Sequence, residues 1–271
     1  MTDTGVTDKV PTGTGRVRLR IRFSKLGKIR WTSHRDLARM WERAFRRVQL
    51  PLAYSEGFSP RPKVSFGLAL STGHESVAEF LDVELTGLDG PAFDGTPPGA
   101  DVLAGLPARL SAALPVGVEA TAVAVLAPGT PSLQEDVTSC SWRWLAAPTE
   151  GSDPVTAEEM AARVIRVLAA PTLEVARNRK GVEVVEDIRP GILSLEVKEE
   201  SVEGVVLEAE LAATPRAVRP AEALAALGPG LEERHVRRTS QWILRHGARR
   251  EPLEAVGDDA TVAPHAMERA S

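Results

Sequence analysis

The stretch Arg16-Val17-Arg18-Leu19-Arg20-Ile21-Arg22-Phe23 decides the fold of the first half of the chain, because apolar and basic residues alternate strictly along it. A period of two predicts a half-buried strand, with its apolar residues facing the core and its arginines on the opposite face. Residues 16–63, which begin with this strand, carry fourteen Lys or Arg against three acids, whereas the whole chain of 271 residues has a net charge of −4. A basic segment of this density on an acidic chain indicates an anionic partner.

A helix is predicted over residues 33–49, because apolar residues recur there with the spacing of one helix face. The apolar stripe consists of Leu37, Met40, Trp41, Ala44, Phe45 and Val48. Ser33 followed by Asp36 predicts an N-cap, and Leu50-Pro51 ends the helix. The side opposite the stripe carries Arg35, Arg39, Arg43 and Arg46.

The order of the predicted elements indicates an α+β protein made of two tandem ferredoxin-like domains. Strands at 64–70, 77–85 and 116–126 and a helix ending near 113 complete a β-α-β-β-α-β unit. The second half repeats this order less clearly, with strands at 137–145, 192–197, 205–211 and 234–244, helices at 156–169 and 220–227, and a strand pair at 173–177 and 182–186. The predicted divisions are a disordered tail at 1–14, a domain at 15–127, a linker at 128–136, a second domain at 137–247 and a disordered tail at 248–271.

The basic residues are predicted to occupy two surfaces, the open face of the first strand and the polar side of the helix. Open sheet faces of this kind often hold nucleic acid. Two alternatives stay open for the strand: Asp82 and Glu84 of the neighbouring strand could pair with its arginines, or the acidic second domain could dock on them. The helix arginines could equally form a solvated face.

Two further features are candidates for binding. Ser33-His34-x-Asp36 opens the helix, where free N–H groups favour an anion and His34 could act as an acid or base; the alternative is a simple cap with His34 packed beside it. The loop 54–63 places aromatic and basic residues together, as base-stacking surfaces do, or else Phe58 plugs the edge of the core. The residues expected to contact RNA or a partner are Arg18, Arg20, Arg22, Lys25, Lys28, Ser33, His34, Arg35, Arg39, Arg43, Arg46, Tyr54, Phe58, Arg61, Lys63, Arg177 and Lys180.

Several classes of protein are excluded or disfavoured by composition. Cys140 is the only cysteine, so the chain can form neither an internal disulfide nor a cysteine-ligated iron–sulfur cluster by itself. Five scattered histidines disfavour a structural zinc site, and we expect no metal and no cofactor in this chain. No apolar run is long enough to span a membrane and no signal peptide is evident, so we expect a cytoplasmic protein.

The motifs resemble those of the uncharacterised radical-SAM-linked protein family. The resemblance is carried by Phe23-Ser24-Lys25-x-Gly27, Ser33-His34-x-Asp36-Leu37, Arg43 to Arg47, Leu50-Pro51, Tyr54-Ser55-x-Gly57-Phe58-x-Pro60-x-Pro62-Lys63 and Glu79-x-x-Asp82, and more weakly by Arg177–Lys180 and Asp187-Ile188-Arg189-Pro190. Members of that family are encoded beside, or fused to, a cobalamin-binding-domain-like radical SAM protein. The resemblance therefore implies a partner, a separately encoded radical SAM enzyme, and no activity.

Three functions compete at this point. The first is a non-catalytic accessory protein that presents RNA to the radical SAM enzyme, since many relatives of such enzymes modify RNA. The second is a purely structural partner whose basic face docks an acidic protein surface. The third is a metal-independent endoribonuclease, similar to the ferredoxin-like CRISPR processing nucleases, with His34 as general base.

Overall fold

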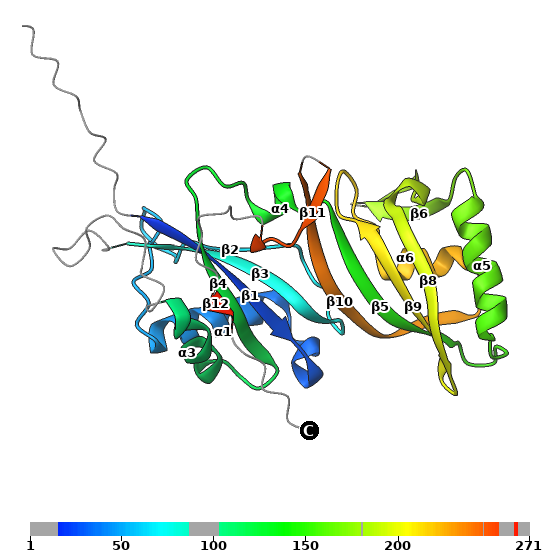
Figure 1. Ribbon diagram of the computed structural model, residues 1–271, viewed down its shortest axis with the longest axis horizontal. Coiled ribbons are helices and arrows are strands. Elements are labelled where there is room, and N and C mark those ends of the chain that lie inside the picture. The colour runs from blue at the N-terminus through cyan, green and yellow to red at the C-terminus, as the bar shows by residue number, and fades with distance from the viewer. Residues whose placement is uncertain (1–15, 87–102, 180, 246, 255–262, 265–271) are drawn as a thin grey trace, which may run out of the picture.

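One mixed sheet runs through the whole molecule and carries its few helices (Figure 1). The computed structural model describes residues 16–86, 103–179, 181–245, 247–254 and 263–264. Within these residues the sheet has the strand order β12-β4-β1-β3-β10-β5-β9-β8, with β2 paired to β3 and β11 paired to β10. The predicted mixed α+β class is confirmed.

The first half of the chain contributes one end of the sheet and helices that cover it. Its strands are β1 (Val17–Lys25), β2 (Val64–Phe66), β3 (Glu75–Leu85) and β4 (Val118–Leu126), and β12 (Ala263–Pro264) pairs with β4 at the edge. Its helices are the 3-10 helix η1 (Gly27–Trp31), α1 (His34–Arg47) and α3 (Leu106–Ala113). β1 lies between β3 and β4 and is antiparallel to both.

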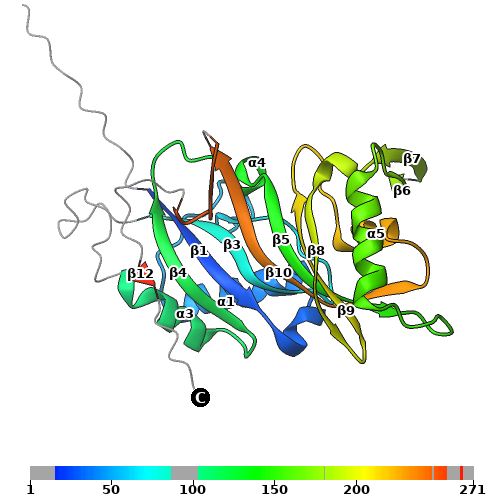
Figure 2. The same ribbon diagram turned by 45° about the vertical axis from the view of Figure 1, so that its right-hand side comes forward.

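The second half contributes the other end of the sheet, with its own helices (Figure 2). Its elements are α4 (Leu133–Asp136), β5 (Ser139–Pro148), α5 (Ala157–Ala169), β6 (Glu174–Arg179), β7 (Val182–Asp187), the 3-10 helix η2 (Arg189–Gly191), β8 (Ile192–Ser201), β9 (Gly204–Ala212), α6 (Pro220–Ala226), β10 (Leu231–Arg245) and β11 (Ala248–Arg250). β6 and β7 form a separate hairpin. The sequence did not predict that β3 and β10 would join the two halves into one sheet. The division of the chain into two domains stays a prediction.

The alternation in β1 and the stripe on α1 meet in the first core. Leu19, Ile21 and Phe23 are buried against Trp41 and Phe45 of α1, as predicted. The Ser33 side chain accepts a hydrogen bond from the Asp36 N–H at 3.2 Å, so the predicted N-cap is also confirmed. The apolar side of α1 is therefore fixed on the sheet, and its arginine side must face outward.

The open arginine face predicted for β1 is wrong for Arg20, which is completely buried. Its guanidinium donates to both carboxylate oxygens of Asp82 at 2.8 and 3.0 Å, and to the carbonyls of Pro131 and Pro252. The residues around Pro252 were predicted to be a disordered tail, but residues 248–254 form β11 and a turn that packs over this face, with Leu253 buried. The alternative of internal pairing, with Asp82 as partner, therefore describes Arg20.

The join between the halves is short, and charged side chains strengthen it. β3 and β10 are parallel and pair only at Arg237 with Glu75 and Arg238 with Ser76 in the described residues. Arg238 is buried and donates to Glu79 at 2.8 Å and to the carbonyls of residues 68 and 69, and its guanidinium lies 4.7 Å from the ring centre of Trp142. One side chain thus binds β3, the loop before it and β5.

Replacing Arg238 with alanine should destabilise the protein strongly, because Glu79 would remain buried without a counter-charge. We expect the free energy of unfolding to fall by about 3–5 kcal/mol, the usual cost of breaking a buried ion pair from one side. Urea denaturation followed by circular dichroism measures it. Arg234→Ala is the matched control, since its pair with Glu232 on the same strand is half-exposed and should contribute less than about 1 kcal/mol. Equal effects of the two variants would contradict this account.

The join should also weaken in acid. Burial alone would raise the pKa of the Glu75 carboxyl, but hydrogen bonds from Arg237 and from the Gly27 N–H outweigh it and hold the pKa below its usual value. A carboxyl whose folded pKa is lowered contributes stability above its unfolded pKa, and this contribution is lost as the pH falls through the folded value. From about pH 5 downward, wild type should lose more stability than Glu75→Gln, measured by urea denaturation across pH. Parallel curves for the two proteins would show that Glu75 does not act in this way.

Candidate nucleic-acid interface

A groove of about 600 Å³ lies between the outward side of α1 and the loop that follows it. It is lined by His34, Arg35, Ala38, Arg39, Glu42, Arg46, Leu52, Tyr54, Pro60, Arg61 and Pro62. We call it the arginine groove. Six of its lining residues were predicted as binding residues from the sequence, where the helix and the loop appeared as separate features.

The helix wall follows from the packing of α1. Because Leu37, Trp41 and Phe45 are buried, residues at the opposite side of each turn must face solvent, and Arg35, Arg39 and Arg46 are exposed there. Arg43 is exposed as well but does not line the arginine groove, so the structure divides the predicted cluster of four.

The loop wall is held by backbone hydrogen bonds on both of its arms. Tyr54 and Pro62 form a bridge, the Ser55 N–H donates to the Arg61 carbonyl at 2.9 Å, and the Lys63 N–H donates to the Ala53 carbonyl at 2.8 Å. The Ala53 N–H in turn donates to the Glu84 carbonyl of β3 at 2.8 Å. Since Pro60 and Pro62 also restrict the backbone, Tyr54 and Arg61 are presented on a wall anchored to the sheet.

Positive charge dominates the arginine groove. Four arginines line it against the single carboxylate of Glu42. Asp36, just outside, lies 3.3 Å from Arg39 in a half-exposed pair, which neutralises little in water. The hydrogen bond from the Ser33 hydroxyl, followed by the Arg39 and Arg35 charges, holds the pKa of the Asp36 carboxyl below its usual value, so this acid stays ionised. Guanidinium groups in this number suit phosphate oxygens, which accept their paired donors.

Aromatic side chains flank these cations. Tyr54 is 47% exposed and lines the arginine groove, so its ring is available for stacking. Phe58 is fully exposed at the tip of the loop, next to Gly57 with a φ of 118°. The alternative in which Phe58 plugs the edge of the core is therefore wrong. Exposed aromatic rings beside a cationic wall are the arrangement used by proteins that bind single-stranded nucleic acid.

His34 lies at the mouth of the arginine groove but lacks the surroundings of a general base. Its ring packs edge-on against Phe66, with ring centres 5.0 Å apart. In the described parts of the chain no hydrogen bond or ion pair orients its imidazole. The structure therefore offers His34 for contact with a ligand and provides no second group that would prepare it for catalysis.

Several predicted residues lie away from the arginine groove. Arg18 and Arg22 are half-buried on β1, where Arg18 donates to the Thr130 carbonyl and Arg22 lies 3.5 Å from Glu251. Lys63 pairs with Glu84 at 3.1 Å, so Glu84 does not neutralise the strand arginines as the alternative supposed. Lys28 is exposed on η1.

The prediction that Lys25 contacts RNA or a partner is wrong. Lys25 is buried, and its ammonium donates to the carbonyls of Arg30 and Thr32. Burial lowers the pKa of Lys25, and the nearby Glu79 charge opposes that effect. Of the basic turn in the second half, Arg177 belongs to β6 and Lys180 lies outside the described residues.

The described residues show neither a metal cluster nor a reactive thiol. They contain no group of three or more His, Cys, Asp or Glu side chains placed to hold a metal ion. Cys140 is free and buried, and burial raises the pKa of its thiol to about 11. No helix in the described ranges combines the length and the apolar character needed to cross a membrane.

Solved structures to which this chain is similar include chains of H/ACA ribonucleoprotein complexes. A chain of the archaeal box H/ACA sRNP Nop10–Cbf5 complex matches with a TM-score of 0.41 and 12% identity, covering 81% of this chain and 46% of that one. A chain of a Cbf5–Nop10–Gar1 complex matches with a TM-score of 0.43 and 15% identity, covering 82% and 48%. A chain of an H/ACA RNP bound to a substrate RNA containing 2′-deoxyuridine matches with a TM-score of 0.41 and 14% identity, covering 84% and 47%.

This protein thus spans just under half the length of the solved chains that it matches. No curated protein matches it. A family match covers residues 18–220, which include the arginine groove, strand β3 of the join and most of the second half. The chain therefore belongs to the family described as uncharacterized protein conserved in bacteria, DUF2344.

Proposed function

We propose that this protein is a non-catalytic accessory protein of a separately encoded radical SAM enzyme, and that it holds an RNA substrate in the arginine groove. The observation that carries the proposal is the composition of that groove: four arginines and an exposed tyrosine against one glutamate. Phosphate neutralisation by such cations supplies most of the affinity of nucleic-acid binding, and base stacking on aromatic rings adds to it.

The groove favours RNA over a flat acidic protein surface because it is concave and rigid on both sides. α1 is fixed by its buried stripe, and the loop is fixed by hydrogen bonds to β3. A strand of phosphates can enter between two such walls and meet arginines from each. A docking protein would have to insert a narrow acidic segment to reach the same side chains.

The radical SAM partner is proposed from the sequence resemblance, and the structure adds one point in its favour. The motif residues Ser33, His34, Tyr54, Pro60 and Pro62 all belong to the arginine groove or to the cap beside it. The exposed part of the motif that links this chain to such enzymes therefore lies at its candidate binding surface, whereas Phe23, Lys25, Glu79 and Asp82 of the same motif are buried. The chain's own single cysteine is buried, so the cluster chemistry would reside in the partner.

We also interpret each half as a ferredoxin-like unit. The order β4-β1-β3-β2 in the first half and β10-β5-β9-β8 in the second both place the first strand of the half beside its fourth and third. This order, with antiparallel neighbours, supports the split β-α-β arrangement in both, the β6–β7 hairpin being an insertion in the second.

Charge reversal at the groove should weaken RNA binding and its salt dependence. We expect Arg39→Glu with Arg46→Glu to lower the affinity for a fluorescent single-stranded RNA and to reduce the slope of log K against log salt by about 1.4, or about 0.7 for each phosphate that is no longer neutralised. Fluorescence anisotropy over about 50–200 mM salt measures both. The matched control is Arg163→Glu with Arg166→Glu on α5, which changes the charge equally at the other end of the molecule.

Two results would contradict the proposal. Equal losses in the groove and control variants would show that net charge, and not the arginine groove, attracts RNA. For the accessory role, the native protein is purified with and without ribonuclease and its partners are identified by mass spectrometry. If no radical SAM protein accompanies it in either preparation, the accessory role is wrong, whereas RNA binding is judged by the anisotropy alone.

A further inference from the structure

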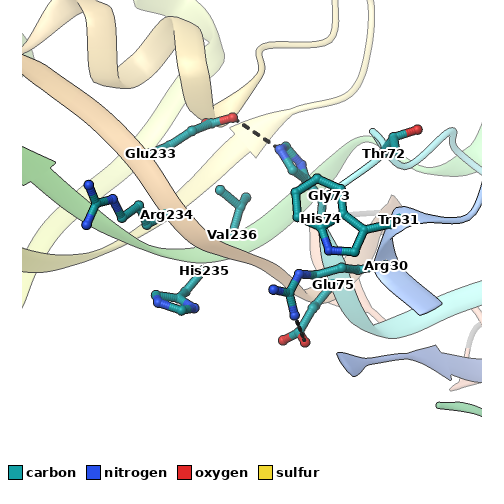
Figure 3. Close-up of a pocket in the computed structure, with 10 residues that line it drawn as sticks. All are labelled: Arg30, Trp31, Thr72, Gly73, His74, Glu75, Glu233, Arg234, His235 and Val236. Carbon is teal, nitrogen blue, oxygen red and sulfur yellow. Dashed lines mark hydrogen bonds and ion pairs between the residues drawn. The ribbon is translucent and has the colours of Figure 1, made fainter. Parts of the chain in front are cut away.

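A second hollow, of about 360 Å³, lies where the two halves meet. Its first wall comes from η1 and the turn before β3, and its second wall comes from the start of β10. The lining residues are Arg30, Trp31, Thr72, Gly73, His74, Glu75, Glu233, Arg234, His235 and Val236. Figure 3 shows Trp31, His74 and Arg30 together on one side, and Glu233, Arg234 and His235 on the other, with Val236 between them. We call this hollow the tryptophan pocket.

Trp31 is 63% exposed, yet the backbone that carries it is held by three hydrogen bonds, from Lys25 and Gly73. The buried Lys25 ammonium donates to the carbonyls of Arg30 at 3.2 Å and Thr32 at 3.1 Å, the two residues that flank Trp31. The Gly73 N–H donates to the same Arg30 carbonyl at 2.8 Å. Burying an ammonium is unfavourable, so the fold gives up some stability to fix a short helix whose largest side chain faces water.

The indole is also constrained through its own ring. Gly73 has a φ of 90°, and a Cβ at this position would lie 2.9 Å from Cζ3 of Trp31, too close for any other residue without displacing the ring. The Arg30 guanidinium lies over the ring, 5.3 Å from its centre. Trp31 is thus a positioned, solvent-facing aromatic platform with a cation over one face.

Polar and aromatic contacts tie the first wall to the second half. His74 Nε2 and Glu233 Oε1 are 3.1 Å apart, and this largely buried contact ties the turn before β3 to the start of β10. The His74 ring packs edge-on against Trp142, which is buried in the second half. Glu75 holds both Arg30 and Arg237, so the two walls of the tryptophan pocket share the charged contacts of the join.

We propose that the tryptophan pocket takes one unpaired base, stacked on the Trp31 indole, of the RNA that lies in the arginine groove. This inference rests on the proposed RNA binding and adds a subsite to it. Trp31 lies only three positions before His34 at the mouth of the groove, so their Cα atoms are at most about 11 Å apart. One strand can therefore cross from one hollow to the other along the start of α1.

The contents of the tryptophan pocket agree with a nucleobase better than with an apolar ligand. Its volume lies at the lower end of small-ligand pockets, which suits a single base. Beside the indole, its lining is polar or charged except for Gly73 and Val236. Arg30 and Arg234 already pair with Glu75 and Glu232, so the main contact offered to a base is the indole, the flat surface that every base can use.

Photocrosslinking locates the base directly. A single-stranded RNA carrying one 5-iodouridine at successive positions is irradiated with the full-length protein, and the crosslinked peptides are identified by mass spectrometry. We expect one position to crosslink at Trp31 and positions a few nucleotides away to crosslink at Tyr54. The Trp31→Ala variant should lose the first crosslink and keep the second, and its affinity should fall by about 5-fold to 140-fold, as expected for one stacked base.

Control variants separate the possible outcomes. Trp31→Phe keeps a stacking ring and should retain most of the affinity, whereas an equal loss in Trp31→Phe and Trp31→Ala would overturn base stacking. Wild-type affinity in Trp31→Ala, with loss in the Arg39→Glu and Arg46→Glu variant, would overturn the subsite and leave the proposed function standing. No RNA binding by wild type would overturn both. Binding of a free nucleotide such as GMP to wild type at the same affinity as the RNA would show that the base does not belong to a strand in the groove.

Discussion

The rest of the structure depends on the buried pair between Arg238 and Glu79. It lies where β10 of the second half meets β3 of the first, and the described residues show only two residue pairs in that join. Because Arg238 also donates to two carbonyls before β3 and covers Trp142, it connects both cores through one guanidinium. Without it the two halves would still be held by two parallel residue pairs and by the contacts of Arg237 with Glu75 and of Glu233 with His74, but the buried charged link between the two cores would be lost.

Arginine therefore has two roles in this structure: buried arginines form ion pairs inside the fold, and exposed arginines can contact a ligand. Arg20 and Arg238 are buried in ion pairs with Asp82 and Glu79, and each planar guanidinium group donates to several acceptors at once. Arg39 and Arg46 lie on a helix whose other side is anchored in the core, and they face a groove with little compensating charge. The net charge of residues 16–63 counted the buried Arg20 together with exposed arginines such as Arg39 and Arg46. Only the exposed arginines can contribute to a field felt by a ligand.

The sequence predicted what depends on local periodicity and missed what depends on distant segments. The spacing of Leu37, Trp41 and Phe45 was enough to place the helix arginines on an outward face. When one side of a helix is apolar and packs on the core, the residues on its opposite side must face solvent. The open face of β1 could not be judged in that way, since it is covered by residues 248–254, more than two hundred positions away and too polar to suggest a strand. The tryptophan pocket was missed for the same reason: Gly73 contacts Trp31 only after the turn before β3 folds against η1, and Glu233 reaches the pocket only after the two halves join.

Lys25 shows how the stable part of the molecule supports its exposed surfaces. A lysine predicted to bind a ligand is instead buried between the sheet and η1, and the two carbonyls it holds belong to the residues on each side of Trp31. The residue that follows this held segment is Ser33, which caps α1 and starts the helix wall of the arginine groove. The platform and the helix wall of the groove are therefore built from one continuous segment, so the geometry between them is set by the fold and does not have to be formed when a ligand binds.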